Sequence, residues 1–154
     1  MVEFKPVVFR LGMEEYGVDI NVVRGIENPL QIVPIHNINK NIKGIINLRG
    51  SIIPVYSLRT KFNMPEATYM ADAKFIIVKA SDDMLIALEV DMVEDIQNIA
   101  DENIHQIPKI ISTSTTAYYD KIINLNGRLI VMLDVSKLLD EGEKEELQKA
   151  IEKI

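Results

Sequence analysis

The residues that most readily perform catalysis or bind metals are few and scattered in this chain. Its two histidines, His36 and His105, lie in predicted loops, and neither has a cysteine, histidine or carboxylate at metal-ligand spacing. The acidic pairs Glu14-Glu15 and Asp82-Asp83 fall in predicted turns, where such residues ordinarily serve the turn itself. An enzyme would need a carboxylate pair that only the fold brings together. We therefore predict a protein with no catalytic residues, no metal site and no cofactor.

The composition excludes several further kinds of chemistry. The chain has no cysteine, which excludes disulfides, zinc–thiolate sites and cysteine nucleophiles. It has no P-loop, no Gly-x-Gly-x-x-Gly and no Gly-x-Ser-x-Gly pattern. Neither a secretory signal nor an apolar run of membrane-spanning length is visible. We expect a cytoplasmic protein that does not insert directly into a membrane.

Charge is distributed unevenly along the chain. The net charge is −6, which argues against broad affinity for nucleic acid. Between Glu27 and Glu66, however, five basic residues stand without an acidic one: Lys40, Lys43, Arg49, Arg59 and Lys61. These are either solvated residues beside turns or a surface that favours an acidic partner.

Two blocks of sequence recur in the same order. Residues 16–26 align without a gap to residues 86–96, 70 positions later, and their apolar and acidic positions coincide. Residues 45–50, Ile-Ile-Asn-Leu-Arg-Gly, return as Ile-Ile-Asn-Leu-Asn-Gly over 122–127, 77 positions later. Two ordered matches at nearly one offset indicate a duplicated unit.

The duplicated unit has the pattern of short β-strands. Runs such as Val7–Leu11 and Phe75–Val78 are β-branched or aromatic, and turn residues separate them at short intervals. Residues 143–154 differ, because Leu147, Ile151 and Ile154 have helical spacing. We predict an all-β fold of two similar subdomains, residues 7–73 and 74–140, and a short C-terminal helix over 141–154.

One turn differs between the two copies. Asn126-Gly127 is a strong signal for a type I′ hairpin, in which both central residues have positive φ. The first copy has Arg49-Gly50 at the same place. If the geometry is kept, Arg49 is strained and projects a cation from a loop tip, as a contact residue would. Otherwise Arg49-Gly50 forms another turn type in which arginine is unstrained.

Three stretches resemble the CheW family of bacterial chemotaxis adaptors. They are Glu-Tyr-Gly-Val-Asp-Ile over 15–20, Ile-Lys-Gly-Ile-Ile-Asn-Leu-Arg-Gly-Ser-Ile-Ile-Pro-Val over 42–55, and Gly-Arg-Leu-Ile over 127–130 with Asp134. The resemblance covers essentially the whole chain, so it implies one CheW-like domain over 1–154. It also implies two five-stranded β-barrels of Src-homology type around a shared apolar core.

The resemblance further implies a function and its partners. The family joins the regulatory domain of the histidine kinase CheA to the cytoplasmic tips of methyl-accepting chemoreceptors, and so controls the kinase within arrays at the membrane. Val23 and Gly44 match positions that the family uses towards the kinase, and Arg49 and Ile96 match positions linked to the receptor. The family often has glutamate two residues after Val23, where this chain has Gly25. Pairing of Arg49 with a carboxylate would then depend on Glu27.

A second hypothesis is a β-barrel that binds a small ligand or an oligonucleotide. The basic stretch over 28–65 motivates it. The net acidity and the absence of tryptophan, which leaves few platforms for base stacking, oppose it.

Overall fold

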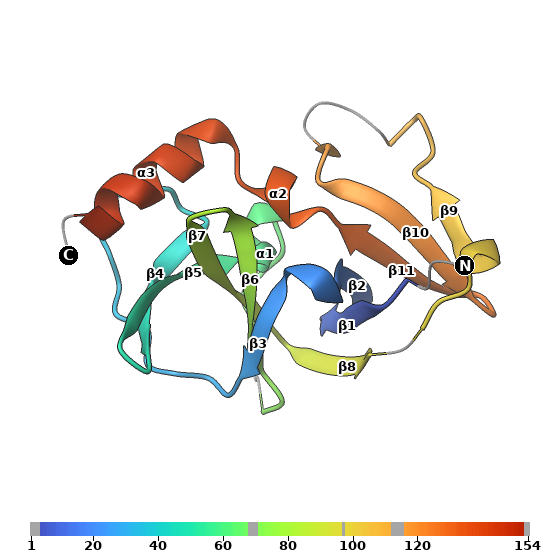
Figure 1. Ribbon diagram of the computed structural model, residues 1–154, viewed down its shortest axis with the longest axis horizontal. Helices are drawn as coiled ribbons and strands as arrows, with labels where there is room; N and C mark the ends of the chain where they lie inside the picture. The colour runs from blue at the N-terminus through green and yellow to red at the C-terminus, as the bar shows by residue number, and fades with distance from the viewer. Residues whose placement is uncertain (1–3, 68–70, 97, 112–115, 153–154) are drawn as a thin grey trace.

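The computed structural model describes residues 4–67, 71–96, 98–111 and 116–152, and side-chain detail is lacking for 95, 96 and 152. Within these described residues, eleven strands form two sheets, and a C-terminal helix lies beside the second of them (Figure 1). The first sheet has six strands in the order β8-β1-β2-β11-β10-β9: β8 (Met92–Ile96), β1 (Pro6–Leu11), β2 (Glu14–Asp19), β11 (Arg128–Leu133), β10 (Tyr119–Leu125) and β9 (Ile104–Gln106). The second has five in the order β3-β6-β7-β5-β4: β3 (Val23–Glu27), β6 (Lys74–Ser81), β7 (Met84–Val90), β5 (Ser51–Ser57) and β4 (Ile42–Leu48).

The two sheets exchange strands between the repeats. The hairpin β1–β2 from the first half pairs with β8 and β11 from the second half. Reciprocally, the hairpin β6–β7 from the second half pairs with β3 and β5 from the first. The contacts β2–β11 and β5–β7 are parallel, whereas the other strand pairs are antiparallel. The division predicted at residues 73 and 74 therefore is not the division between the sheets, because each sheet takes strands from both sides of it.

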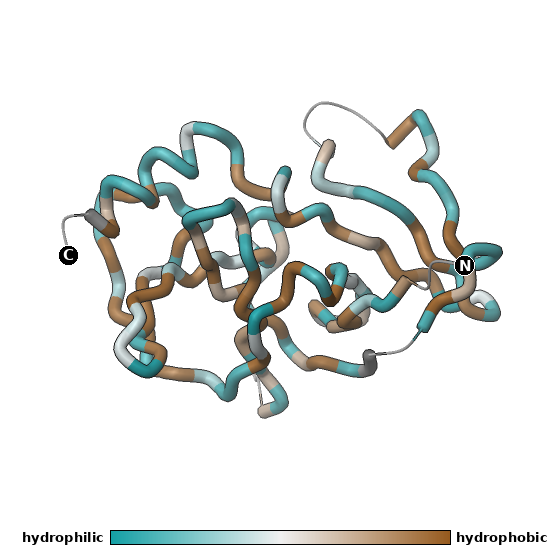
Figure 2. The backbone as a smooth tube through the Cα atoms, in the orientation of Figure 1, coloured by the Kyte–Doolittle hydropathy of each residue, from teal (hydrophilic) through white to brown (hydrophobic). Residues whose placement is uncertain are grey.

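The predicted shared core is present and is the largest of the three apolar clusters formed by described residues. It joins β1 and β2 to β6 and β7, with Phe9, Val18, Ile76 and Leu88 all fully buried. Each sheet also has a smaller cluster on the face turned away from the shared core. In the five-stranded sheet it lies around Ile53 and Phe75, and in the six-stranded sheet around Val8 and Ile130. Central strands such as β1 and β6 are thus buried on both faces, which explains their continuous apolar sequences. In Figure 2 hydrophobic residues, drawn in brown, follow one another along the strands.

The C-terminal helix α3 (Glu141–Glu152) docks on the five-stranded half. Leu147 is 1% exposed and belongs to the shared core. Glu143 is 2% exposed, and its carboxylate accepts hydrogen bonds from Tyr56 Oη at 3.2 Å and Asn41 Nδ2 at 3.3 Å. The Lys61 ammonium lies 3.4 Å from the same carboxylate, so the buried charge is compensated. Burial and the Glu143 charge raise the pKa of Tyr56 well above its ordinary value.

The all-β prediction with a short terminal helix is confirmed, although one sheet has a sixth strand, β9. In the described part of the chain, two further α-helices of one turn each follow β5 and β11: α1 (Leu58–Lys61) and α2 (Val135–Leu138). Each is capped by the side chain that precedes it, Ser57 or Asp134. Among the described residues, no helix has both the length and the apolar character needed to cross a membrane.

Candidate partner-binding site

The turn at Arg49 keeps the geometry of its counterpart at Asn126. The φ angles are 49° and 90° for Arg49 and Gly50, and 54° and 91° for Asn126 and Gly127. The same hydrogen bond stabilises both turns. The backbone N–H of Gly50 donates to Asn47 Oδ1, and that of Gly127 donates to Asn124 Oδ1, each at 2.9 Å. These angles fit a type I′ turn, so Arg49 adopts a conformation that costs arginine more than asparagine.

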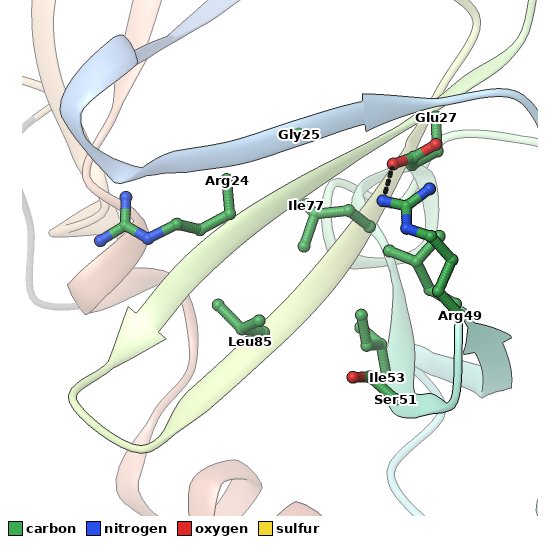
Figure 3. A pocket seen from close by; sticks show the side chains of 9 residues that line it. Arg24, Gly25, Glu27, Arg49, Ser51, Ile53, Ile77 and Leu85 are labelled. Carbon is green, nitrogen blue, oxygen red and sulfur yellow. Dashed lines mark hydrogen bonds and ion pairs between the residues drawn. The ribbon is translucent and has the colours of Figure 1, made fainter.

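Arg49 projects from this turn and pairs with Glu27 on β3. Arg49 Nη2 lies 2.7 Å from Glu27 Oε1, and the arginine side chain is 74% exposed. The hydrogen bond that Arg49 donates to Glu27, together with the charge of that carboxylate, raises the pKa of the Arg49 guanidinium. The two side chains point towards each other from β3 and from the β4–β5 turn (Figure 3). Glu27 therefore supplies the carboxylate that Gly25 cannot.

A small pocket opens beside this ion pair at one end of the five-stranded sheet. We call it the first mouth: Arg24, Gly25, Glu27, Leu48, Arg49, Ser51, Ile53, Ile77 and Leu85 line it. Its apolar part comes from Leu48, Ile53, Ile77 and Leu85, and two arginines and one glutamate stand at its rim (Figure 3). The volume of about 210 Å³ is below that of ordinary ligand pockets, which hold about 300 Å³ or more. It suits an inserted protein side chain better than a whole small ligand.

Gly44 is buried rather than presented at the surface. Its φ is 154°, and a Cβ added there would lie 2.2 Å from the carbonyl oxygen of Val33. Val33 in turn pairs with Ile45 through two backbone hydrogen bonds of 2.8 and 2.9 Å. Gly44 thus lets the segment before β4 lie directly against that strand. Any effect of Gly44 on a partner passes through this segment.

The remaining two predicted site residues lie on different sheets. Val23 begins β3, is half-buried and packs against the shared core. Ile96 ends β8, where its backbone is paired with Val7, and its side chain is outside the described part of the chain. The structure therefore brings β3 and Arg49 to one pocket, and it places Ile96 on the other sheet. The pocket residues Arg24, Ser51 and Leu85 were not predicted, since they come from three strands far apart in sequence.

The basic stretch is largely neutralised within the fold. Four of its five cations form ion pairs: Lys43 with Glu89 at 2.7 Å, Arg49 with Glu27, Arg59 with Asp91, and Lys61 with Glu143. A surface that binds nucleic acid needs cations free to meet phosphates. The pairing therefore removes the observation that motivated the oligonucleotide hypothesis.

Asp91 links the two sheets through hydrogen bonds. Its carboxylate accepts a hydrogen bond from Arg59 Nη2 at 2.5 Å and another from the backbone N–H of Gly12 at 2.6 Å. Gly12 lies in the β1–β2 turn and Arg59 in α1, so one carboxylate links the six-stranded sheet to the end of the five-stranded one. Burial would raise the pKa of Asp91, but the hydrogen bonds from Arg59 and Gly12 outweigh it and lower the pKa.

The two histidines considered for catalysis stay apart. His36 and His105 are both exposed, on different parts of the molecule. Within the described ranges, no group of three His, Cys, Asp or Glu side chains is arranged to hold a metal ion.

Comparison with known proteins decides the family. A family model described as "CheW-like domain" matches residues 5–143. The chain belongs to the CheW family. It is 34% identical over 137 residues to the chemotaxis protein CheW of Klebsiella aerogenes, an alignment that spans 89% of this chain and 82% of that protein. It is 29% identical over 147 residues to CheW of Bacillus subtilis, spanning 96% and 92%.

A solved CheW has the same fold. The crystal structure of the scaffolding protein TtCheW from Thermoanaerobacter tengcongensis superimposes with a TM-score of 0.83 at 32% identity, covering 96% of this chain and 94% of that one. The predicted family and CheW-like fold are confirmed. The CheW family comprises chemotaxis scaffolding proteins rather than enzymes, which agrees with the prediction of a non-catalytic protein.

Proposed function

We propose that this CheW-family protein is an adaptor that couples the cytoplasmic tips of chemoreceptors to the regulatory domain of the histidine kinase CheA. The observation that carries the proposal is the Asn-Leu-Arg-Gly turn, which presents Arg49 beside an apolar pocket within a CheW-like domain that spans residues 5–143. Such a protein acts by binding alone and needs no reacting group. It would be recruited from the cytoplasm to receptor arrays through these partners.

We propose a specific division of roles among the residues that match the family's partner-binding positions. Arg49 is an exposed cation of the site, paired with Glu27, and we assign it to the receptor together with Ile96. Val23 and Gly44 we assign to the kinase. Val23 would contribute the exposed part of its side chain, and Gly44 would act by seating Val33, which is exposed.

Titration of the chain with a purified CheA regulatory domain tests the kinase half of the proposal. We expect saturable one-to-one binding, which calorimetry would measure, and Val23→Glu should weaken it. Lys137→Glu is the control, since Lys137 is an exposed residue on α2, and it should leave the affinity for the kinase domain unchanged. Absence of binding at tens of micromolar would refute the kinase assignment.

A receptor fragment tests the other half. A soluble hairpin of a chemoreceptor tip should bind the wild-type chain and bind Arg49→Asn more weakly, while kinase binding by that variant stays unchanged. An equal loss of both affinities would show that Arg49 does not separate the two partners.

A further inference from the structure

The first mouth has a repeat-related counterpart at the corresponding end of the six-stranded sheet. The repeat offsets of 70 and 77 carry Arg24 to Glu94, Leu85 to Glu15 and Ser51 to Arg128. We call this corresponding place the second mouth. The duplicated fold thus presents the same three positions twice, with different side chains.

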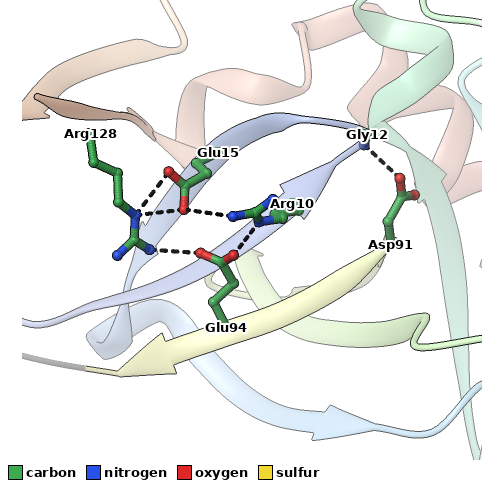
Figure 4. Close-up of polar contacts among 6 residues, drawn as sticks. All are labelled: Arg10, Gly12, Glu15, Asp91, Glu94 and Arg128. Carbon is green, nitrogen blue, oxygen red and sulfur yellow. Dashed lines mark hydrogen bonds and ion pairs between the residues drawn. The ribbon is translucent and has the colours of Figure 1, made fainter.

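In the second mouth these side chains bind one another. Arg128 Nε lies 2.7 Å from Glu15 Oε1, and Arg128 Nη2 lies 2.7 Å from Glu94 Oε2. Arg10 completes a ring, because it is hydrogen-bonded to Glu94 and lies 3.9 Å from Glu15 (Figure 4). Arg10 also has a counterpart, since it faces Glu15 across β1–β2 as Lys79 faces Leu85 across β6–β7.

The ring is neutral and partly shielded from solvent. It alternates two guanidinium groups with two carboxylates, and the Glu15 and Glu94 side chains are only 9% and 13% exposed. Removing one member would leave the remaining charges with fewer partners, which is costly where the two carboxylates are largely buried. Entry of a foreign apolar group would require the same separation of charges.

The first mouth has the opposite character. An exposed Leu85 stands where the ring has Glu15, and the small Ser51 stands where it has Arg128. Arg24 and Arg49 give the rim an excess of positive charge over Glu27. An apolar side chain flanked by a carboxylate is complementary to this combination.

We propose that the ring of Arg10, Glu15, Glu94 and Arg128 is a plug that closes the second mouth, so that an apolar, acidic element of a protein partner enters the first mouth alone. The two repeats would thereby differ in binding although their backbones are alike, because only the first mouth could bind such an element. This property belongs to the side chains themselves, whichever protein the partner is.

An apolar anion, 1-anilinonaphthalene-8-sulfonate, serves as the probe for both mouths. Methyl resonances of Ile53, Ile77 and Leu85 report on the first mouth, and those of Ile130 and Leu129 report on the second. We expect the probe to shift only the first set in the wild-type chain. The variant Glu15→Leu/Glu94→Arg/Arg128→Ser, which gives the second mouth the residues of the first, should gain a second site with an affinity within about tenfold of the first.

The reverse exchange provides a test that leaves the ring intact. Arg24→Glu/Ser51→Arg/Leu85→Glu should lower the affinity of the first mouth at least about tenfold. Lys137→Ser is the control for loss of a surface cation and should not alter either site. Probe-induced shifts at the second mouth of the wild-type chain, or a folded ring variant without a second site, would overturn the proposal. If the ring variant does not fold, undiminished affinity in the reverse exchange would overturn it instead.

Discussion

Arg49 and Asn126 occupy equivalent positions in two turns of one geometry, with φ angles of 49° and 54°. Asparagine tolerates positive φ far better than arginine does. The first copy therefore carries a less favourable residue at the tip of its hairpin, and that residue points to solvent beside a pocket. Strain at an exposed contact position is typical of sites kept for binding.

Replacing Arg49 with Asn should relieve this strain. We expect a melting temperature equal to or slightly above that of the wild type, because an exposed ion pair with Glu27 contributes little to stability. Binding to a receptor-tip fragment should weaken about tenfold, as for a hot-spot arginine. Glu27→Gln is the matched control, since it breaks the ion pair without changing the turn. Thermal melts and titrations measure both effects, and a much lower melting temperature for Arg49→Asn would contradict the turn argument.

Gly44→Ala should destabilise the fold by about 2–4 kcal/mol, because the new Cβ would meet the Val33 carbonyl at 2.2 Å in an already unfavourable backbone conformation. Because Gly44 is buried against Val33, we expect substitution there to lower the stability of the fold as well as any affinity for the kinase. Gly25→Ala is the control, since its Cβ would make only an ordinary 3.5 Å contact with Glu27. Urea denaturation of the two variants gives the comparison. Equal stability of both would show that the Val33 segment yields easily.

Asp91 should make the free energy of unfolding depend on pH. Its pKa lies below the ordinary 3.8 in the folded chain, so its ionised form stabilises the fold above that pH, and this contribution is lost as pH falls through the lowered pKa. Asp91→Asn should cost about 1–3 kcal/mol at pH 7, since it removes the charge from the bond with Arg59. The difference between variant and wild type should narrow as pH falls below 3.8. Denaturation at a series of pH values tests this, and a difference independent of pH would refute it.

Leu147 should hold α3 on the domain. Leu147→Ala removes a side chain that is buried in the shared core, and should cost about 2–4 kcal/mol. Gln148→Ala, at the neighbouring exposed position, should change stability little. Amide exchange over α3, with chemical denaturation, would distinguish loss of the helix from loss of the whole domain. No effect of Leu147→Ala would mean that the helix is dispensable for stability.

Local features of the fold were readable from the sequence because they depend on neighbouring residues. The strand runs, the Asn-Gly turn and the helical spacing of α3 all follow from short-range backbone preferences. The conformation of Arg49-Gly50 stayed open between two turn types until the φ angles were known. The duplication was equally plain, since it needs only a comparison of residues 16–26 with 86–96 and of 45–50 with 122–127. The pairing of Arg49 with Glu27 could be named as a possibility, but its geometry could not be derived.

The sequence by itself therefore determined that this protein is a duplicated β structure that resembles the CheW family. Only the tertiary structure decided which strands share a sheet, because the parallel contacts of β2 with β11 and of β5 with β7 depend on burial across the whole chain rather than on local pattern. The same long-range packing buried Gly44 under Val33 and joined Arg10, Glu15, Glu94 and Arg128 into one ring. Side chains more than a hundred residues apart meet there because strand exchange brings β2 against β11.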